Sequence, residues 1–282
     1  MVGLELATDR SLQMSLANVP TTTPYKRVSC AVVNILALET TEPSIVAQAD
    51  EANSNIASAI ESKEDILRAM TNVRLNSNPD VVPLHGGPVE VTLSMDLSKI
   101  REVDTVRGEV EIIAMVSILW KDHDLSWLST MRNESGSSQH SPDRVDSFRI
   151  AVKRLWSPDI VAYNPVTDPE LLSPPIALVS ADGTVLYVPN LRIRFRCNLE
   201  DFEKPQGANC TLNYGSWTHD GNKISLKENG VSVYDYEVDP RFDLLGTFAE
   251  VEVKYYPCCP EPYPLTKFTF NIKKKSRSIF SW

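Results

Sequence analysis

Histidines are scarce in this sequence, and it lacks the spaced motifs on which hydrolytic and zinc chemistry depend. The 282 residues include four histidines: His85, His123, His140 and His219. No His-x-x-x-His, Cys-x-x-Cys or Gly-x-Ser-x-Gly segment occurs. His219 beside Asp220 could orient a general base, but a histidine in a polar turn ordinarily has no such role. We therefore expect no enzyme: no catalytic residues, no cofactor and no metal site.

Long apolar runs and an excess of basic charge are also missing. A helix that spans a bilayer needs ~20 apolar residues, and no such run occurs, so we expect a soluble protein without a membrane span. Lys and Arg number 28 against 37 Asp and Glu, which gives a net charge of −9. This balance argues against a nucleic-acid partner, because phosphate binding relies on clustered basic residues. An acidic protein is better suited to a cationic ligand.

Five cysteines are an odd number for a secreted protein, and the N-terminal region accounts for one of them. Cys30 lies in a short apolar run, residues 28–38, that follows Lys26-Arg27, a pattern typical of a signal peptide. An irregular N-terminal arm is the alternative. We expect residues 1–49 to be an N-terminal extension with a signal peptide, and residues 50–282 to be one secreted domain. The sequons beginning at Asn133 and Asn209 are predicted glycosylation sites.

The periodicity of apolar residues predicts an all-β fold after one short helix. Ile66, Met70 and Val73 line one face of a helix that Ser62 caps. From Val89 to Leu97 apolar and polar residues alternate, as in a half-buried strand. Further strands are expected over residues 109–120, 146–153, 176–179, 185–196, 211–217, 250–256 and 267–273. Many short strands without intervening helices favour an antiparallel β-sandwich with immunoglobulin-like topology.

Several aromatic residues stand at strand ends or in loops, next to turn signals. They are Tyr163, Trp217, Tyr256 and Tyr263, with Trp120 at the end of a long strand. Taken singly, each is ordinarily a packing residue. Gathered around one cavity, they would bind an ammonium group by cation–π attraction, on the order of 2 kcal/mol for a desolvated contact. The pattern therefore predicts an aromatic cage.

The segment YYPCCPEPY places Cys258 and Cys259 side by side between prolines. A disulfide between neighbours closes almost no chain, so stability would not explain it. Without Cys30, four cysteines remain and three connectivities are open. Each of the adjacent cysteines could instead pair elsewhere, with Cys197 or Cys210.

A set of spaced motifs carries a family resemblance. PVEVTLSMDLSKIREVD, the strand ending in Trp120, LWSPDIVAYN, the Cys197 to Cys210 loop, GSWTHDG and YYPCCPEPY occur in this order between about Ser62 and Lys275. The sequence resembles the ligand-binding domain of Cys-loop pentameric receptors, and more closely the soluble acetylcholine-binding proteins of invertebrates. The resemblance implies a pentameric ring with a binding site between subunits.

The resemblance also implies a role for individual residues. Tyr163, Trp217, Tyr256 and Tyr263 fall on the principal-face aromatic positions, and Cys258 and Cys259 on a vicinal disulfide at the tip of a capping loop. Trp120 falls on the complementary face of the neighbouring subunit, with Leu178, Leu186 and Val188 on its variable strands. Cys197 pairs with Cys210.

The function that the resemblance implies is a secreted homopentamer that captures acetylcholine or nicotine-like amines. The segment NLEDFEKPQGAN between Cys197 and Cys210 is polar and lacks the Phe-Pro-Phe-Asp core that packs on a receptor's membrane domain. This departure favours a soluble binding protein over the extracellular domain of a ligand-gated channel. A secreted β-sandwich that has lost its ligand is the alternative of a different class.

Overall fold

The computed structural model describes residues 63–76, 78–127 and 145–275. They belong to one compact unit of the chain, Asp50–Trp282. The predicted signal peptide with Cys30, the capping residue Ser62 and the sequon at Asn133 lie outside the described residues. Those predictions are therefore not tested.

A single α-helix precedes the strands in the described part of the chain. Helix α2, Lys63–Asn76, turns Ala69 and Val73 into the core, with Ile66 and Met70 half-buried beside them. Their spacing is that of one helix face, as the sequence predicts. The helix packs against the short 3-10 helix η1, His123–Leu125, whose Leu125 side chain is buried. No helix among residues 63–275, gaps apart, combines the length and apolar content that crossing a bilayer requires.

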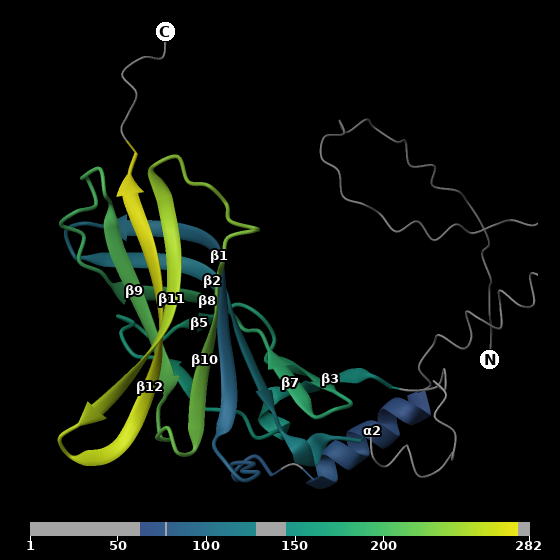
Figure 1. Cartoon of the computed structure of the whole chain (residues 1–282). Coiled ribbons are helices and arrows are strands. Elements are labelled where there is room, and N and C mark those ends of the chain that lie inside the picture. The colour runs from purple at the N-terminus through teal and green to yellow at the C-terminus, as the bar shows by residue number, and fades with distance from the viewer. Residues whose placement is uncertain (1–62, 77, 128–144, 276–282) are drawn as a thin grey trace, which may run out of the picture. The chain divides into compact units, whose positions relative to one another are not determined.

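The strands form two sheets (Figure 1). The larger sheet runs in the order β10-β1-β2-β7-β6-β3, with β8 paired to β2 and β5. Its strands are β1 (Val89–Asp104), β2 (Glu109–Lys121), β3 (Ser147–Ala151), β5 (Glu170–Leu171), β6 (Ile176–Ser180), β7 (Thr184–Tyr187), β8 (Asn190–Arg196) and β10 (Ile224–Ser232). The smaller sheet runs β11-β12-β9-β4. Its strands are β4 (Ile160–Ala162), β9 (Ala208–Ser216), β11 (Phe242–Tyr256) and β12 (Cys259–Lys274), and η2 (Val152–Arg154) follows β3.

The core lies between the two sheets. Along β1 the alternation predicted from sequence buries Val91, Leu93, Met95 and Leu97 completely or nearly so. Phe195 of the larger sheet meets Phe270 of the smaller one, with ring centroids 6.4 Å apart. Inward-facing residues from both sheets therefore share one apolar layer, as a β-sandwich requires. The predicted all-β sandwich with one short helix is confirmed.

The structure refines the predicted strands: β11 and β12 each begin eight residues before the predicted starts at residues 250 and 267. The single strand predicted over residues 185–196 is two strands, β7 and β8, with Pro189 between them. Proline has no backbone N–H to donate to a ladder, so the strand is interrupted there. The carbonyl of Pro189 accepts a hydrogen bond from the backbone N of Val116 at 3.0 Å. Strands β4, β5 and β10 were not predicted, since β4 and β5 are very short and β10 carries exposed polar residues over half its length. The β1–β10 pair is parallel, whereas the other ladders are antiparallel.

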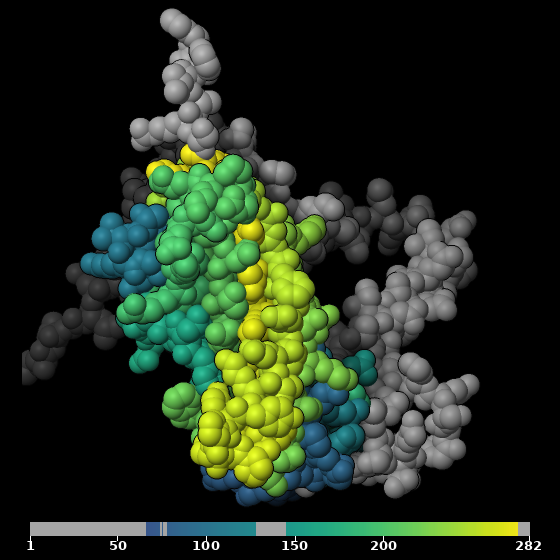
Figure 2. All heavy atoms as spheres, turned by 60° about the vertical axis from the view of Figure 1, so that its left-hand side comes forward, coloured from purple at the N-terminus to yellow at the C-terminus, as the bar shows by residue number. Residues whose placement is uncertain are grey.

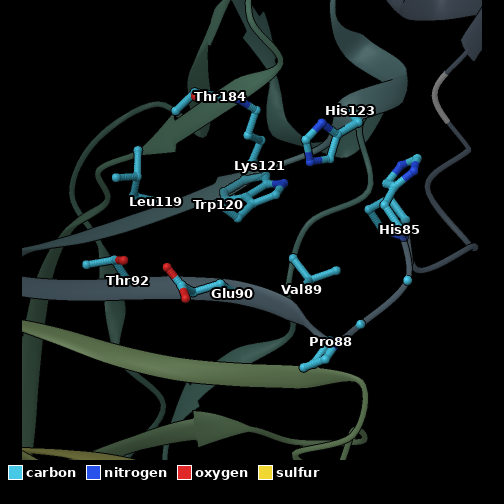
Figure 3. A pocket seen from close by; sticks show the side chains of 13 residues that line it. His85, Pro88, Val89, Glu90, Thr92, Leu119, Trp120, Lys121, His123 and Thr184 are labelled. Carbon is cyan, nitrogen blue, oxygen red and sulfur yellow. The ribbon is translucent and has the colours of Figure 1, made fainter.

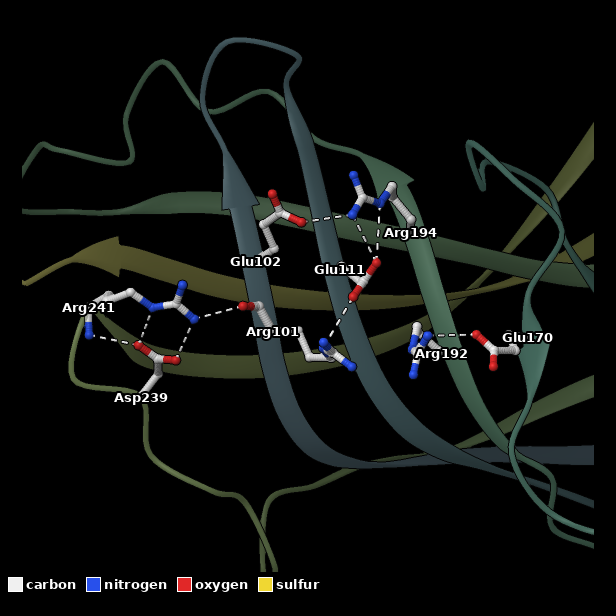
Figure 4. A network of polar contacts seen from close by, with 8 residues as sticks. All are labelled: Arg101, Glu102, Glu111, Glu170, Arg192, Arg194, Asp239 and Arg241. Atoms are coloured by element: carbon white, nitrogen blue, oxygen red, sulfur yellow. Dashed lines mark hydrogen bonds and ion pairs between the residues drawn. The ribbon is translucent and has the colours of Figure 1, made fainter.

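Charged side chains tie the strands of the larger sheet together on its outer surface (Figure 4). Arg194 of β8 contacts Glu102 of β1 at 2.7 Å and Glu111 of β2 at 3.0 Å. Beyond β10, the Arg241 guanidinium holds the pKa of Asp239 below its usual value and donates to the carbonyl of Arg101 at 2.7 Å. Exposed pairs such as Arg192 with Glu170 contribute little singly, whereas the Asp239 and Glu111 carboxylates are largely buried.

Candidate functional site

Two aromatic residues meet at one end of the smaller sheet. Tyr163 follows β4, and its backbone N donates to the carbonyl of Asn213 in β9 at 2.8 Å, which continues the β4–β9 ladder. Trp217 directly follows β9. The two ring centroids lie 6.0 Å apart at an interplanar angle of 46°. Trp217 is 69% exposed, which is unusual for tryptophan and leaves its ring open to a ligand.

The turn that presents Trp217 is held by one carboxylate. Asp159 accepts from the Ser216 hydroxyl at 2.5 Å and from both the backbone N and the hydroxyl of Thr218 at 2.6 Å. His219 Nδ1 lies 3.2 Å from the same carboxylate. Burial would raise the pKa of Asp159, but these hydrogen bonds outweigh it and hold the pKa below the usual value. Asp159 is therefore ionised at neutral pH and fixes the backbone on both sides of Trp217.

A long hairpin, β11–β12, carries the remaining predicted residues of the cage. Tyr256 lies opposite Cys259 in the ladder, and Tyr263 lies opposite Lys254. The Tyr256 and Tyr263 rings meet edge to face, with centroids 5.3 Å apart. Cys258 and Cys259 form a disulfide at the turn between the strands. Figure 2 shows this hairpin in yellow, standing at the surface of the described domain.

The hairpin is joined to the turn that holds Trp217. The backbone N of Gly221 donates to the carbonyl of Pro262 in β12 at 2.7 Å. Burial raises the pKa of Tyr163, and its electrostatic interaction with Tyr256 raises that pKa further. The turn and the hairpin are therefore adjacent, and each carries one pair of rings, Tyr163 with Trp217 and Tyr256 with Tyr263; we call these four residues the aromatic cluster.

Packing beneath the cluster is tight at Gly215. A Cβ added there would lie 2.8 Å from Cε2 of Tyr163 and 2.6 Å from Cδ2 of Leu265. The Tyr163 hydroxyl donates to the carbonyl of the next residue, Ser216. Glycine at this position therefore lets the Tyr163 ring lie against the β9 backbone.

The aliphatic residues predicted for the complementary face lie on the other sheet. Leu178 and Leu186 are direct cross-strand neighbours between β6 and β7, and Leu186 pairs in turn with Leu119 of β2. All three are at least partly exposed on the outer face. Val188 is also partly exposed, just beyond β7. The cage residues and this aliphatic row therefore occupy separate surfaces of one chain.

Trp120 does not lie on the outer face of the sheet in the described chain. Its side chain is 2% exposed and packs edge-on against Trp156, with centroids 6.4 Å apart. Successive residues of a strand point to opposite faces, and Trp120 points to the core while Leu119 points outward. Met115 lies on the same side of β2 as Leu119. The alternation in EVEIIAMVSILWK already indicates these orientations.

The second disulfide, Cys197–Cys210, closes the loop between β8 and β9. Phe202 of this loop is 5% exposed, whereas Glu203 and Lys204 are exposed. Asn209 of the second sequon is exposed in β9, and its Oδ1 accepts from Asn271 at 2.8 Å. Glycosylation of Asn209 stays a prediction.

Comparison with known proteins gives a consistent match. Residues 65–276 match the family described as the neurotransmitter-gated ion-channel ligand binding domain. The acetylcholine receptor subunit alpha-type acr-16 of Caenorhabditis briggsae is 29% identical over 217 residues, which cover 76% of this chain and 40% of the relative. The acetylcholine receptor subunit alpha-like 2 of Drosophila melanogaster is 25% identical over 78% of this chain and 39% of its own length. The rat neuronal acetylcholine receptor subunit alpha-10 is 29% identical over 67% of this chain and 41% of its length. The chain thus spans about 40% of the length of these relatives.

Proposed function

Because the chain belongs to the neurotransmitter-gated ion-channel ligand-binding domain family, we propose that it binds acetylcholine and related nicotinic amines in its aromatic cluster. The relatives are named as acetylcholine receptor subunits, which supports this ligand class. The proposal is for binding without catalysis. It concerns the cage of Tyr163, Trp217, Tyr256 and Tyr263, with Cys258 and Cys259 at the capping tip.

One observation carries the proposal: an exposed tryptophan is held in place beside Tyr163, in a turn that is hydrogen-bonded to the hairpin carrying Tyr256 and Tyr263. Trp217 keeps 69% of its surface exposed, yet Asp159 fixes the backbone on both sides of it. A ring presented in this way offers its electron-rich face to a cation. Because the turn is already ordered, little conformational entropy is lost when the ligand binds. The expected contribution is on the order of 2 kcal/mol for a desolvated ammonium contact.

The exposure of the cage suggests that a second chain completes it. Trp217 and Tyr256 keep large exposed fractions in one protomer, so a bound cation would stay partly in water. The row of Leu119, Leu178 and Leu186 offers an apolar surface with which a neighbouring copy could close the site. We propose a homopentamer with the cage on one side of each interface and this row, with Val188 and Met115, on the other.

Retention of the ligand would depend on the β11–β12 hairpin. Closure of the segment from Tyr256 to Tyr263 over the amine would exclude water and strengthen the cation–π contacts. The vicinal disulfide stiffens the tip that makes this contact. Identical hairpin positions in free and ligand-bound crystals would count against closure.

A secreted, soluble form is part of the proposal. Two disulfides are typical of an oxidising, extracellular environment. The Cys197–Cys210 loop turns Phe202 inward and exposes charged residues, which supports a domain that needs no membrane partner at this loop.

The experiment is a titration of purified protein with acetylcholine and nicotine, followed by tryptophan fluorescence. Among the described tryptophans, Trp120, Trp127 and Trp156 are buried and Trp217 alone is exposed, so a ligand-dependent change reports on Trp217. We expect a saturable change in the unaltered protein. Because both Trp217→Ala and Trp217→Phe remove this fluorophore, their affinity is measured by isothermal titration calorimetry, in which binding should be lost in Trp217→Ala and weakened in Trp217→Phe. Native mass spectrometry should show a pentamer.

The matched control is Tyr255→Ala. Tyr255 is also 69% exposed and adjoins Tyr256 in β11, but it lies at the register shift of the β11–β12 ladder and makes neither of the ring contacts that join the cage residues in pairs. Its loss should leave affinity unchanged. A folded pentamer that binds neither ligand would refute the proposal and favour a structural β-sandwich.

The second candidate is the extracellular domain of a ligand-gated channel. The receptor subunits to which the chain is similar favour it. The two candidates share the cage and differ in what the transcript encodes after Trp282. Sequencing full-length transcripts separates them: a downstream membrane domain would establish the channel.

A further inference from the structure

A cavity of about 420 Å³ lies beside the start of β1 and the end of β2 (Figure 3). This is the end of the two strands that is farther from the turn connecting them. Residues 83–88, which precede β1, form one wall, and the ends of β2 and β7 form the other. Its lining is mostly polar and includes His85, Lys121 and His123. It is separate from the aromatic cluster, and it shares Leu119 with the aliphatic row of the proposed interface.

An unsatisfied donor faces this cavity. Trp120 lines it, is 2% exposed, and its Nε1 has no hydrogen-bond partner among the described residues. Figure 3 shows the indole nitrogen on the side of the ring toward His85 and His123. Indole Nε1–H can only donate, and a buried donor without an acceptor is costly. An acceptor in the cavity would remove that cost.

Beside the cavity, three metal-ligating side chains converge. One ligand atom from each of His85, Asp122 and Asp124 lies within 4.8 Å of the others. His85 Nε2 is 3.6 Å from Asp124 Oδ2. Asp122 is 3% exposed, and its Oδ1 accepts the backbone N of Asp124 at 3.0 Å. No lysine or arginine of the described chain lies within ion-pair distance of Asp122. Buried carboxylates are ordinarily paired with a cation or coordinated to a metal.

We propose that His85, Asp122 and Asp124 bind a divalent transition-metal ion of the zinc type. Imidazole nitrogen with carboxylate oxygens is a donor set that Zn²⁺ accepts, whereas Ca²⁺ requires six to eight oxygen ligands. The side chains of His85 and Asp124 are 36% and 56% exposed, respectively. They can therefore rotate to bring their ligand atoms within coordinating distance of one metal ion. A fourth ligand from solvent would lie on the side of the ring toward which Trp120 Nε1 points, and as zinc-bound hydroxide it could accept a hydrogen bond from that donor.

The metal would join two segments that the fold brings together from distant parts of the chain. His85 lies before β1, and Asp122 and Asp124 lie at the start of η1, against which α2 packs. The sequence predicts no metal site because these ligands do not form a spaced motif. Only the return of β2 beside the start of β1 places them together.

The test is isothermal titration of the full-length protein with ZnCl₂, with MgCl₂ as the comparison. We expect one saturable Zn²⁺ per chain and no Mg²⁺ binding. His85→Ala and Asp124→Asn should each weaken Zn²⁺ binding by more than about tenfold, since even indirect partners of a metal ligand are worth ~10–100-fold. Both side chains are exposed, so the variants should fold, which far-ultraviolet circular dichroism checks.

The matched control is His219→Ala, which removes a histidine that lies 3.2 Å from another carboxylate, Asp159. Zn²⁺ affinity should not change in this variant. The proposal is overturned if the unaltered protein shows no saturable Zn²⁺ binding, or if both His85→Ala and Asp124→Asn retain it. Binding lost in His219→Ala alone would also overturn it, because the metal would then lie at the Asp159 turn.

Discussion

Replacement of Asp159 by asparagine tests whether one carboxylate holds the turn that presents Trp217. Asp159 accepts hydrogen bonds from Ser216, from two groups of Thr218 and from His219. Asparagine keeps one acceptor oxygen and puts an NH₂ donor in place of the other. With its oxygen toward Thr218, the amide keeps the bond from that backbone N–H and turns its NH₂ toward the Ser216 hydroxyl, which can accept. The substitution therefore removes the negative charge from these hydrogen bonds.

The magnitude follows from the charge that these hydrogen bonds lose. A hydrogen bond to a charged group contributes about 1.5–3 kcal/mol, and the Asp159 side chain is 27% exposed, which favours the lower part of that range. We expect Asp159→Asn to lower the free energy of unfolding by about 2 kcal/mol. Loss of the turn should also misplace Trp217 and weaken nicotine binding by about tenfold, part of one cation–π contact.

The assays are urea unfolding and ligand titration across pH. The folded pKa of Asp159 lies below its ordinary value of 3.8, so its stabilisation is present above that pH and is lost as pH falls through the folded pKa. The difference in unfolding free energy between the two proteins should therefore be constant from pH 7 to about pH 5 and shrink below about pH 4.

The control is Asp104→Asn in the β1–β2 turn. Asp104 also accepts two backbone N–H groups, from Val106 and Arg107, both at 2.9 Å, and its side chain is 22% exposed, close to the 27% of Asp159. It lies in the larger sheet's β1–β2 turn, so its replacement should cost a similar amount of stability and leave ligand affinity unchanged. Wild-type stability and affinity in Asp159→Asn would refute our account of the turn.

Three other substitutions probe the cage, the capping tip and the core. Gly215→Ala should cost about 1–3 kcal/mol and shift Tyr163, because the new methyl would lie 2.8 Å from that ring; a stable variant with full affinity would contradict this packing. The double substitution Cys258→Ser and Cys259→Ser should lower ligand affinity. It should change the free energy of unfolding by no more than ~0.5 kcal/mol, since the disulfide closes almost no chain; a large loss of stability would contradict this account of the disulfide. Trp120→Ala should cost about 3–5 kcal/mol of stability as a core truncation; if stability held and binding alone fell, Trp120 would belong to the site after all.

Local pattern was enough to predict most of the sandwich. The alternation from Val89 to Leu97 and the spacing of Ile66, Met70 and Val73 were correct because one face of each element is buried against a single core. Strand β10 was not predicted because several of its side chains, such as Glu228, are exposed to solvent, so the apolar alternation that marks a strand is weak there. An edge strand needs backbone hydrogen bonds from a distant partner, and sequence pattern does not record them.

Periodicity and motif order are properties of the chain, so they were enough to predict the fold class and to single out the aromatic and cysteine residues. Which of these residues meet depends on how the strands pair. Tertiary structure brought Tyr163 to Trp217 across the β4–β9 ladder, turned Trp120 into the core, and placed His85 beside Asp124. The physical reason is that strand pairing joins residues far apart in the chain, while the two-residue alternation of each strand decides which face a side chain serves.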